Sequence, residues 1–198
     1  MGAAEDNQHM APLRLVLAGA PIDNPNKGLE ALGLSVIDAL DHYCALRFES
    51  GVVTVLTNRR GKPVSYATER ENAHIEEVGA HFTRRWYRAD SWARVRLAQL
   101  TGHGRNRLAQ RIDDADAVLD LSGGDSFTEI YGSKRLAMVC APKLAALRAR
   151  TPLVFLPQTY GPFLTREGRQ QAEAVVRGAA LAWARDAQSL DRLLELAG

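Results

Sequence analysis

The sequence predicts an α/β fold in which a parallel sheet is flanked by helices. Short apolar runs of strand length alternate with longer segments whose apolar residues recur every three or four positions. The first three segments follow the order strand, helix, strand, which implies a right-handed crossover and a parallel sheet. Several apolar runs also end abruptly in glycine and small polar residues, as strands do at the ligand-binding edge of an α/β sheet.

Composition places the chain among globular proteins and argues against several functional classes. Its 198 residues suffice for one large domain or two small ones, and a hydrophobic fraction of 46% is ordinary for such domains. The net charge of +2 is too small to indicate nucleic-acid binding. No apolar run approaches the ~20 residues of a membrane-spanning helix. Cys44 and Cys140 fall in apolar helical patterns, so we expect reduced, buried thiols and a cytoplasmic location. No cysteine or histidine spacing resembles a metal site, and we expect neither a metal nor a cofactor.

The amino-terminal third is expected to contain a leader and the first crossover. Residues 1–12 are polar without an apolar core, which indicates a disordered leader rather than a secretory signal. Residues 13–19 form a strand apolar enough to be central, and residues 52–57 form the second strand. Residues 28–45 form the helix between them. Its apolar positions at helical spacing are Leu29, Leu32, Val36, Leu40 and Tyr43.

The middle of the chain is less regular. Between residues 58 and 79 only Val64–Ala67 suggests a short strand or hairpin arm. Residues 82–100 predict one amphipathic helix, and residues 105–112 a short second one. The apolar stripe of the longer helix would comprise Phe82, Trp86, Ala89, Ala93, Leu97 and Leu100.

The remainder predicts three further strands, each followed by a helix. The strands fall at residues 117–121, 152–157 and 180–184, and the helices at residues 133–150, 166–177 and 187–197. The whole of residues 13–198 is therefore expected to form a single α/β domain. Four strands would end in polar loops at residues 19–28, 122–126, 158–161 and 185–186. Because parallel strands present their carboxyl ends at one edge, these loops should converge there.

The loop Ser122-Gly123-Gly124-Asp125-Ser126 has the composition of a ligand-contacting turn. Paired glycines allow positive φ and close approach of a ligand to the backbone. Ser126 and Glu129 fit a capping box that would start a helix there and create an anion site. The alternative is an ordinary strand-to-helix turn with an N-cap.

The candidate functional side chains also have structural interpretations. Asp125 and Glu129 are either general acid–base groups or helix caps. Gln158 could bind sugar hydroxyls or fix its own loop. Arg185 could bind a carboxylate or phosphate, or pair with an acid such as Asp186. In the first loop, Asn26 and Lys27 could hold an anionic or sugar ligand, or Asn26 could cap the helix. The G-x-G-x-x-G and Walker A patterns are absent, which argues against the common dinucleotide and P-loop enzymes.

A basic, aromatic segment occupies residues 84–111. Its only acid is Asp90, and its aromatic residues are Trp86, Tyr87 and Trp92. Such a segment could lie on an anionic membrane surface or meet an anionic acceptor, but the weak apolar stripe favours a solvated helix face. The arginines are Arg84, Arg85, Arg88, Arg94, Arg96, Arg105, Arg107 and Arg111.

Four pieces of the sequence, in order, resemble the polysaccharide pyruvyl transferase family. They are Asn26-x-Gly28-x-x-Ala31-Leu32, Ser122-Gly123-Gly124-Asp125-Ser126, Leu156-Pro157-Gln158-Thr159-Tyr160-Gly161-Pro162-Phe163 and Ala184-Arg185-Asp186-x-x-Ser189. The resemblance implies an enzyme that transfers a pyruvyl group from phosphoenolpyruvate to a sugar or glycan as a ketal, in exopolysaccharide or cell-surface glycan biosynthesis. It also implies a Rossmann-like domain of a glycosyltransferase-B-like architecture, in which two such domains face each other across a cleft.

The resemblance carries specific residues into that cleft. It places Asn26, Gly28, Gly124, Asp125, Gln158, Gly161 and Arg185 there, and Lys27, Gly123 and Ser126 complete the set that we expect to bind substrate. Asp125 is the best acid–base candidate, and Arg185 and Lys27 are the best partners for the donor's carboxylate and phosphate. Two such domains need roughly 300 residues, so we expect this chain to correspond to the amino-terminal half, with a second domain or subunit supplying the other wall. The alternatives are a non-catalytic carbohydrate-binding half-domain or partner subunit, and a nucleotide-sugar glycosyltransferase.

Overall fold

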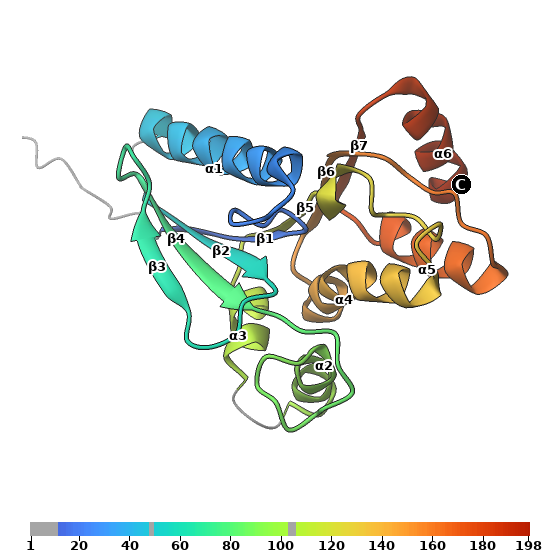
Figure 1. The fold of residues 1–198 in the computed structure, drawn as a ribbon, viewed down its shortest axis with the longest axis horizontal. Helices are drawn as coiled ribbons and strands as arrows, with labels where there is room; N and C mark the ends of the chain where they lie inside the picture. Colours follow the sequence, from blue (N-terminus) through green and yellow to red (C-terminus); the bar gives the residue numbers. More distant parts are fainter. Residues whose placement is uncertain (1–11, 48–49, 103–105) are drawn as a thin grey trace, which may run out of the picture.

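A seven-stranded, mostly parallel sheet forms the centre of the molecule (Figure 1). The computed structural model describes residues 12–47, 50–102 and 106–198, so the predicted leader lies outside the described residues except for Pro12. The strand order is β3-β4-β2-β1-β5-β6-β7, and only β3 is antiparallel to its neighbour. The predicted α/β class, a Rossmann-like parallel sheet flanked by helices, is confirmed.

The elements alternate along the chain much as the apolar patterns predict. The strands are β1 (Leu13–Ala18), β2 (Gly51–Thr57), β3 (Val64–Ala67), β4 (Ala73–Gly79), β5 (Ala117–Asp120), β6 (Leu153–Gln158) and β7 (Leu181–Ala184). The helices are α1 (Lys27–Arg47), α2 (Trp92–Thr101), α3 (Arg107–Asp113), α4 (Ser133–Ala149), α5 (Arg166–Arg177) and α6 (Ala187–Ala197). None of the helices within the described ranges is long and apolar enough to cross a membrane.

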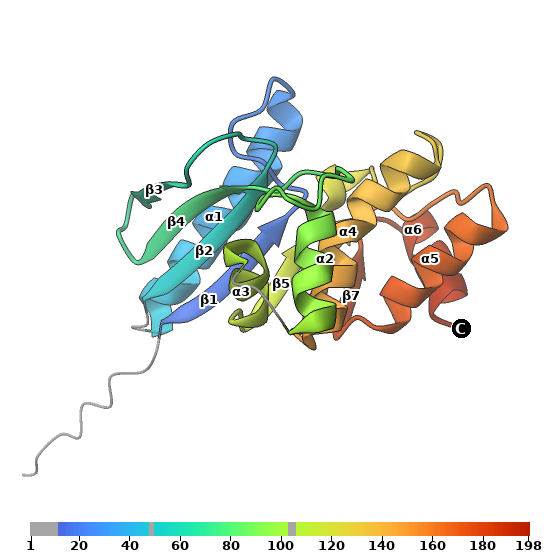
Figure 2. The ribbon, with the colours of Figure 1, turned by 90° about the horizontal axis from the view of Figure 1, so that it is seen from below.

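Helices cover both faces of the sheet, and the central strand β1 is buried from both sides. Helix α1 lies on one face, α2, α3 and α4 lie on the other, and α5 and α6 pack beside β7 (Figures 1 and 2). Val16 and Ala18 join the larger core under α2–α4, whereas Leu17 joins the smaller core with Ile37 of α1. This alternation follows from the opposite directions of successive side chains on a strand.

The winding of the chain creates a crevice beside β1. From β1 the chain runs outward through α1, β2 and β4, then returns through α2 and α3 to β5 on the other side of β1. The loops after β1 and β5 therefore leave the sheet toward opposite faces. In open α/β sheets this reversal of strand order is where ligands bind.

The helix predicted over residues 82–100 is wrong in its first half. Residues 82–91 form turns, and α2 begins only at Trp92 because the Ser91 hydroxyl caps it by accepting the N–H of Ala93 at 3.2 Å. The buried face of α2 is Trp92, Val95 and Ala98, not the predicted stripe. The aromatic residues of the preceding turns are consequently left at the surface.

Two further expectations need correction. In α1 the buried positions include Gly33, Ile37 and Cys44, whereas Leu32 and Tyr43 of the predicted stripe are exposed. Strand β4 was missed because its charged residues break the apolar pattern, although β2 pairs with it along its whole length. Both cysteines are buried and neither forms a disulfide, as expected.

We predict that Gly19→Ala destabilises the protein by about 2–4 kcal/mol, measured by urea unfolding. Gly19 has φ +69°, and an added Cβ would lie 2.5 Å from the backbone nitrogen of Ser122, which must then move. Gly102→Ala is the matched control, because Gly102 has φ +62° with nothing within 4 Å of the added atom. Equal losses in the two variants would show that the close approach of the two loops does not matter.

Candidate functional site

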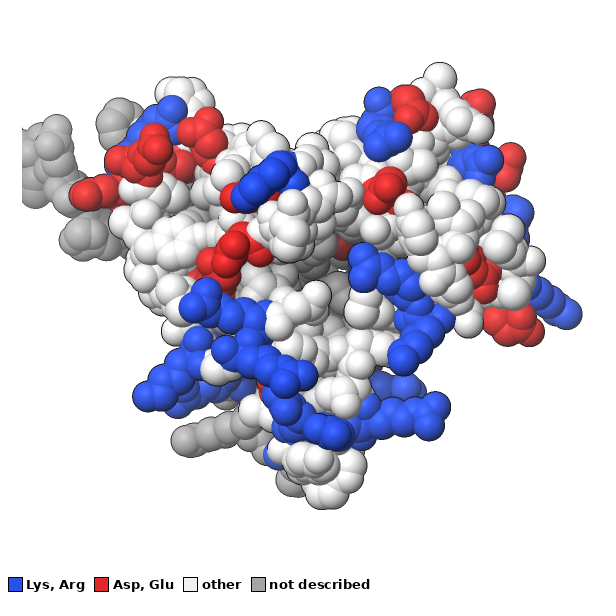
Figure 3. Space-filling view, viewed as in Figure 1, with Lys and Arg blue, Asp and Glu red and all other residues white. Residues whose placement is uncertain are grey.

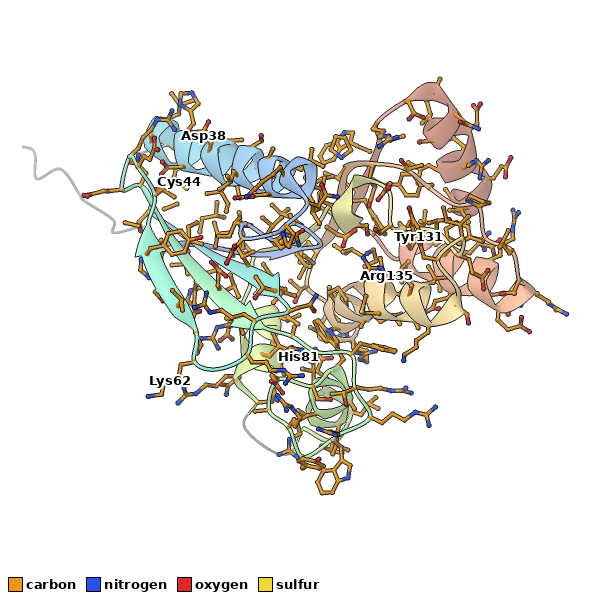
Figure 4. The ribbon with its side chains drawn as sticks, viewed as in Figure 1. Asp38, Cys44, Lys62, His81, Tyr131 and Arg135 are labelled. Carbon is orange, nitrogen blue, oxygen red and sulfur yellow. The ribbon has the colours of Figure 1, made fainter. Side chains whose placement is uncertain are left out.

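A polar cavity of about 500 Å³ occupies the crevice beside β1. Its walls are the loops after β1, β2 and β5, the start of α1 and one side of α4. Figure 4 shows Tyr131 and Arg135 at the wall formed by the α4 segment. The polar side chains of the lining are Asn24, Asn26, Thr57, Asn58, Asp120, Ser122, Asp125, Ser126, Tyr131 and Arg135.

The floor of the cavity is the glycine-rich turn that follows β5. Ser122, Gly123 and Gly124 all have positive φ (47°, 65° and 80°), which two glycines tolerate and a serine adopts only at a cost. The Gly123 N–H donates to the carbonyl of Gly19 at 2.7 Å, so the loops after β1 and β5 are joined directly. The paired glycines thus serve the close approach of two backbones as well as access to the cavity.

A buried polar network lies directly beneath this turn. Lys143 of α4 is fully buried and its Nζ lies 2.8 Å from Asp120 Oδ1 at the end of β5. The same ammonium donates to Ser122 Oγ at 2.8 Å, and that hydroxyl donates to Asp120 Oδ2 at 2.7 Å. Gln158 Nε2 also donates to Asp120 Oδ2, at 3.2 Å. The network fixes the strained Ser122 and joins α4 to β5 and β6.

Aromatic rings enclose the charged end of Lys143. Its Nζ lies 5.2 Å from the ring centroid of Phe127 and 5.6 Å from that of Phe155, which is cation–π range. The carbonyl of Val139 accepts its remaining hydrogen bond at 2.9 Å. A buried lysine and aspartate with this many partners avoid the large cost of isolated buried charges.

Asp125 stands at the cavity wall with accessible polar neighbours. Its carboxylate accepts from the Ser126 hydroxyl at 3.4 Å and from the Tyr131 hydroxyl at 3.5 Å, and its side chain is exposed. Arg135, in the first turn of α4, lines the same cavity. A carboxylate, a phenol and a guanidinium can together exchange a proton and hold an anion.

Asn26 and its neighbours combine a structural role with a place at the cavity. The Asn26 Oδ1 accepts the N–H groups of Gly28 at 3.1 Å and Leu29 at 3.3 Å, so Asn26 caps α1 and also lines the cavity. Gly28 donates its N–H to this cap and does not line the cavity. Lys27 points to solvent and pairs with Glu30 at 2.6 Å.

The candidates at or after the ends of β6 and β7, and Gly124 of the β5 turn, lie beside the cavity rather than in it. Gln158 is fully buried and bonds Asp120, and Gly161 is buried with its N–H donated to the Phe127 carbonyl at 2.9 Å. Gly124 is also buried, with its carbonyl accepting from Thr159 N–H. Arg185 pairs with the adjacent Asp186 at 3.2 Å, the structural alternative considered for it. The structure therefore brings four of the predicted site residues together at the cavity: Asn26, Gly123, Asp125 and Ser126. The other six do not line it: Lys27, Gly28, Gly124, Gln158, Gly161 and Arg185.

The capping box predicted from Ser126 and Glu129 is wrong. No helix starts there, and α4 begins at Ser133. Glu129 is buried and accepts the N–H groups of Leu164 at 2.7 Å and Thr165 at 2.8 Å together with the Thr165 hydroxyl at 2.7 Å. It therefore joins the β5 loop to the segment before α5, a long-range contact that local spacing cannot reveal.

Sequence reasoning missed Arg135, Tyr131 and the Asp120–Lys143 pair. The signal for Arg135 was available in helical spacing. Arg135, Met138 and Pro142 recur at three- and four-residue intervals on the side of α4 away from Leu136 and Cys140, and this side lines the cavity. Nothing local pairs Asp120 with a lysine 23 positions later.

The fold and the cavity place the chain in the class of doubly wound α/β domains, with a polar candidate ligand site where the strand order reverses. A family model described as polysaccharide pyruvyl transferase matches residues 39–198. The match covers most of the chain, and the chain belongs to this family. The predicted family is confirmed.

A comparison with solved structures finds a likeness to an α,α-trehalose-phosphate synthase (UDP-forming) from Burkholderia vietnamiensis. The TM-score is 0.45 at 12% sequence identity, over 92% of this chain and 42% of that chain. The chain therefore spans less than half the length of that structure. A comparison with curated proteins finds no match.

We predict that Lys143→Met lowers the free energy of unfolding by about 3–5 kcal/mol, because it leaves the buried Asp120 carboxylate without its counter-charge. Lys134→Met, an exposed change on the same helix, should stay within about 0.5 kcal/mol of the wild type. Urea unfolding followed by circular dichroism measures both. A loss at Lys143 no greater than at Lys134 would contradict the role of the pair.

We predict a pH-dependent loss of stability in Glu129→Gln. The Thr165 hydroxyl and the backbone N–H groups of Thr165 and Leu164 hold the pKa of Glu129 below its usual range. Because its pKa is lower in the folded state, the ionised carboxylate stabilises the fold at any pH above the unfolded pKa of about 4.3. This stabilisation is lost as the pH falls through the native pKa. The urea midpoints of wild type and variant should thus differ at about pH 7 and converge toward about pH 3. A difference that does not change with pH would contradict this.

Proposed function

We propose that this chain forms the acceptor-side half of a pyruvyl transferase, which moves a pyruvyl group from phosphoenolpyruvate to a sugar or glycan as a ketal. The observation that carries the proposal is the placement of Asp125, Tyr131 and Arg135 around one strand-end cavity in a chain of this family. The proposed setting is exopolysaccharide or cell-surface glycan biosynthesis in the cytoplasm.

The reaction has charge and proton requirements that these side chains can meet. A proton must reach the methylene carbon of the enol, and a sugar hydroxyl must lose its proton as its oxygen attacks the adjacent carbon. Phosphate then leaves and a second hydroxyl closes the ketal. Asp125 is the proposed acid–base group, because it is exposed to the cavity and accepts hydrogen bonds from two hydroxyls.

Arg135 is the proposed partner for the donor's carboxylate or phosphate. Arginine suits both anions because its planar fork makes bidentate contacts. Arg185 and Lys27 are less suited to this role in the described structure, since each pairs with a nearby acid and neither lines the cavity. A second domain or subunit is proposed to supply the remaining donor contacts across the cavity.

We predict that Asp125→Asn lowers the rate of ketal formation by about 10²- to 10⁴-fold, because the variant can no longer exchange the proton. Asp191→Asn, on the exposed side of α6, is the control and should keep the rate within about twofold. The assay uses labelled phosphoenolpyruvate with a glycan acceptor and measures both phosphate release and the pyruvylated product. Wild-type turnover in Asp125→Asn would refute the acid–base role.

The same assay separates the alternative functions. Glycan binding without phosphate release would indicate a carbohydrate-binding half-domain or subunit. Protection from heat by a nucleotide-sugar, and not by phosphoenolpyruvate, would indicate a glycosyltransferase.

A further inference from the structure

A second and larger hollow, of about 830 Å³, runs between α4 and the segment that contains residues 82–84 and α2. Its floor is apolar and its rim is basic. The apolar residues are Phe82, Trp92, Ala93, Ala137, Ala141 and Leu144. Arg84, Arg96, Lys134 and Arg148 form the rim, and we call these four residues the basic rim.

No carboxylate neutralises the basic rim within the part of the chain that the structure describes. The ion pairs found there, such as Arg88 with Asp90 and Arg111 with Glu76, involve other arginines. Figure 3 shows Lys and Arg side chains gathered over the lower half of this face, around an uncharged surface. The total charge is only +2, so this is a local concentration of positive charge rather than a property of the whole molecule.

The charged form of Arg148 is disfavoured by its surroundings in the basic rim. Its guanidinium is partly buried, and both burial and the nearby Arg96 lower its pKa. Its one described hydrogen bond is from Nε to the amide oxygen of Gln99 at 3.1 Å. Two close guanidinium groups without an acid are stabilised when an anion binds between or beside them.

Exposed aromatic rings stand next to the basic rim. Trp86 is 60% and Tyr87 68% exposed, and their rings pack edge to face with centroids 6.4 Å apart. Two adjacent exposed rings beside several cations form a contiguous patch, and such patches mark protein or membrane interaction sites. Trp and Tyr beside arginine are typical of membrane interfaces, where the rings lie at the headgroup level and the cations meet phosphates.

Hydrogen bonds hold the aromatic turn in place. Arg88 binds Asp90 through two bonds, at 2.9 and 2.6 Å, and the Ser91 hydroxyl donates to the Thr83 carbonyl at 2.9 Å. Asn106 Nδ2 donates to the Ala89 carbonyl at 2.8 Å and so attaches the turn to the start of α3. The turn therefore presents its rings from a fixed platform, which lowers the entropy lost on binding.

We propose that this surface docks on an anionic lipid bilayer, with Trp86 and Tyr87 at the headgroup level and the basic rim binding lipid phosphates. Charge complementarity supports an anionic partner, and the apolar floor with its exposed rings supports an amphiphilic one over a soluble polyanion. The proposal does not depend on the chemistry of the polar cavity.

The polar cavity would then lie close to the membrane. Trp92 lines both hollows. Of the neighbouring residues Lys134 and Arg135, the first lines the larger hollow and the second lines the polar cavity. The two hollows thus share the wall formed by Trp92 and the first turn of α4.

We predict that the chain co-floats with vesicles of phosphatidylglycerol and phosphatidylcholine and not with vesicles of phosphatidylcholine alone. Arg84→Ala combined with Arg96→Ala should weaken binding about 30-fold, because each cation near an anionic surface contributes roughly fivefold. Trp86→Ala combined with Tyr87→Ala should weaken binding on the order of tenfold with the charge unchanged. Wild-type binding should also shift tryptophan emission to shorter wavelength, and Trp86→Phe should remove most of this shift.

The matched control is Arg47→Ala combined with Arg166→Ala, two exposed arginines on α1 and α5, which should change binding by less than about twofold. Circular dichroism confirms that each variant is folded. No vesicle binding, or equal weakening in the control, would overturn the proposal. Retention on heparin that is insensitive to Trp86→Ala with Tyr87→Ala, without vesicle binding, would instead identify a polyanion site.

Discussion

The buried ion pair between Lys143 and Asp120 is the constraint on which the candidate site depends. Asp120 ends the strand beside β1, and Lys143 lies in the middle of α4, so their contact sets the distance of that helix from the sheet. The hydroxyl of Ser122 completes the network and holds the turn with positive φ. One wall and the floor of the polar cavity are thus fixed by a buried ion pair, while Asp125 and Arg135 remain accessible above it.

The class of fold could be predicted because it depends on a property that the sequence displays directly. Apolar runs such as residues 13–19 and 152–157 form strands of a parallel sheet that is covered by helices, so they stand out from their surroundings. The turns at residues 82–91 and strand β4 were not predictable in this way. Trp86 is a large apolar residue of the kind expected in a core, but it lies at the surface. The glutamates of β4 interrupt the apolar pattern by which a strand is recognised. Tertiary contacts decide both cases.

The sequence predicted where the site lies, but not which residues form it. The convergence of polar strand ends indicated the edge of the sheet, and Asp125 and Asn26 do line a cavity there. Gln158 could not be placed, because only the folded structure shows that it turns inward to Asp120. Arg135 could have been found from helical spacing, whereas the pairing of Glu129 with Thr165 spans 36 residues and leaves no local trace.

Trp92 gives the two hollows a shared wall, and this has a thermodynamic consequence. Its ring lines both hollows, so a ligand that displaced the ring in one hollow would change the shape of the other. Any such coupling is reciprocal. A ligand in the polar cavity would change the affinity of the larger hollow for its ligand by the same factor as the second ligand changes the affinity of the cavity for the first. A ligand in either hollow would thus meet the same indole, which belongs to the larger core.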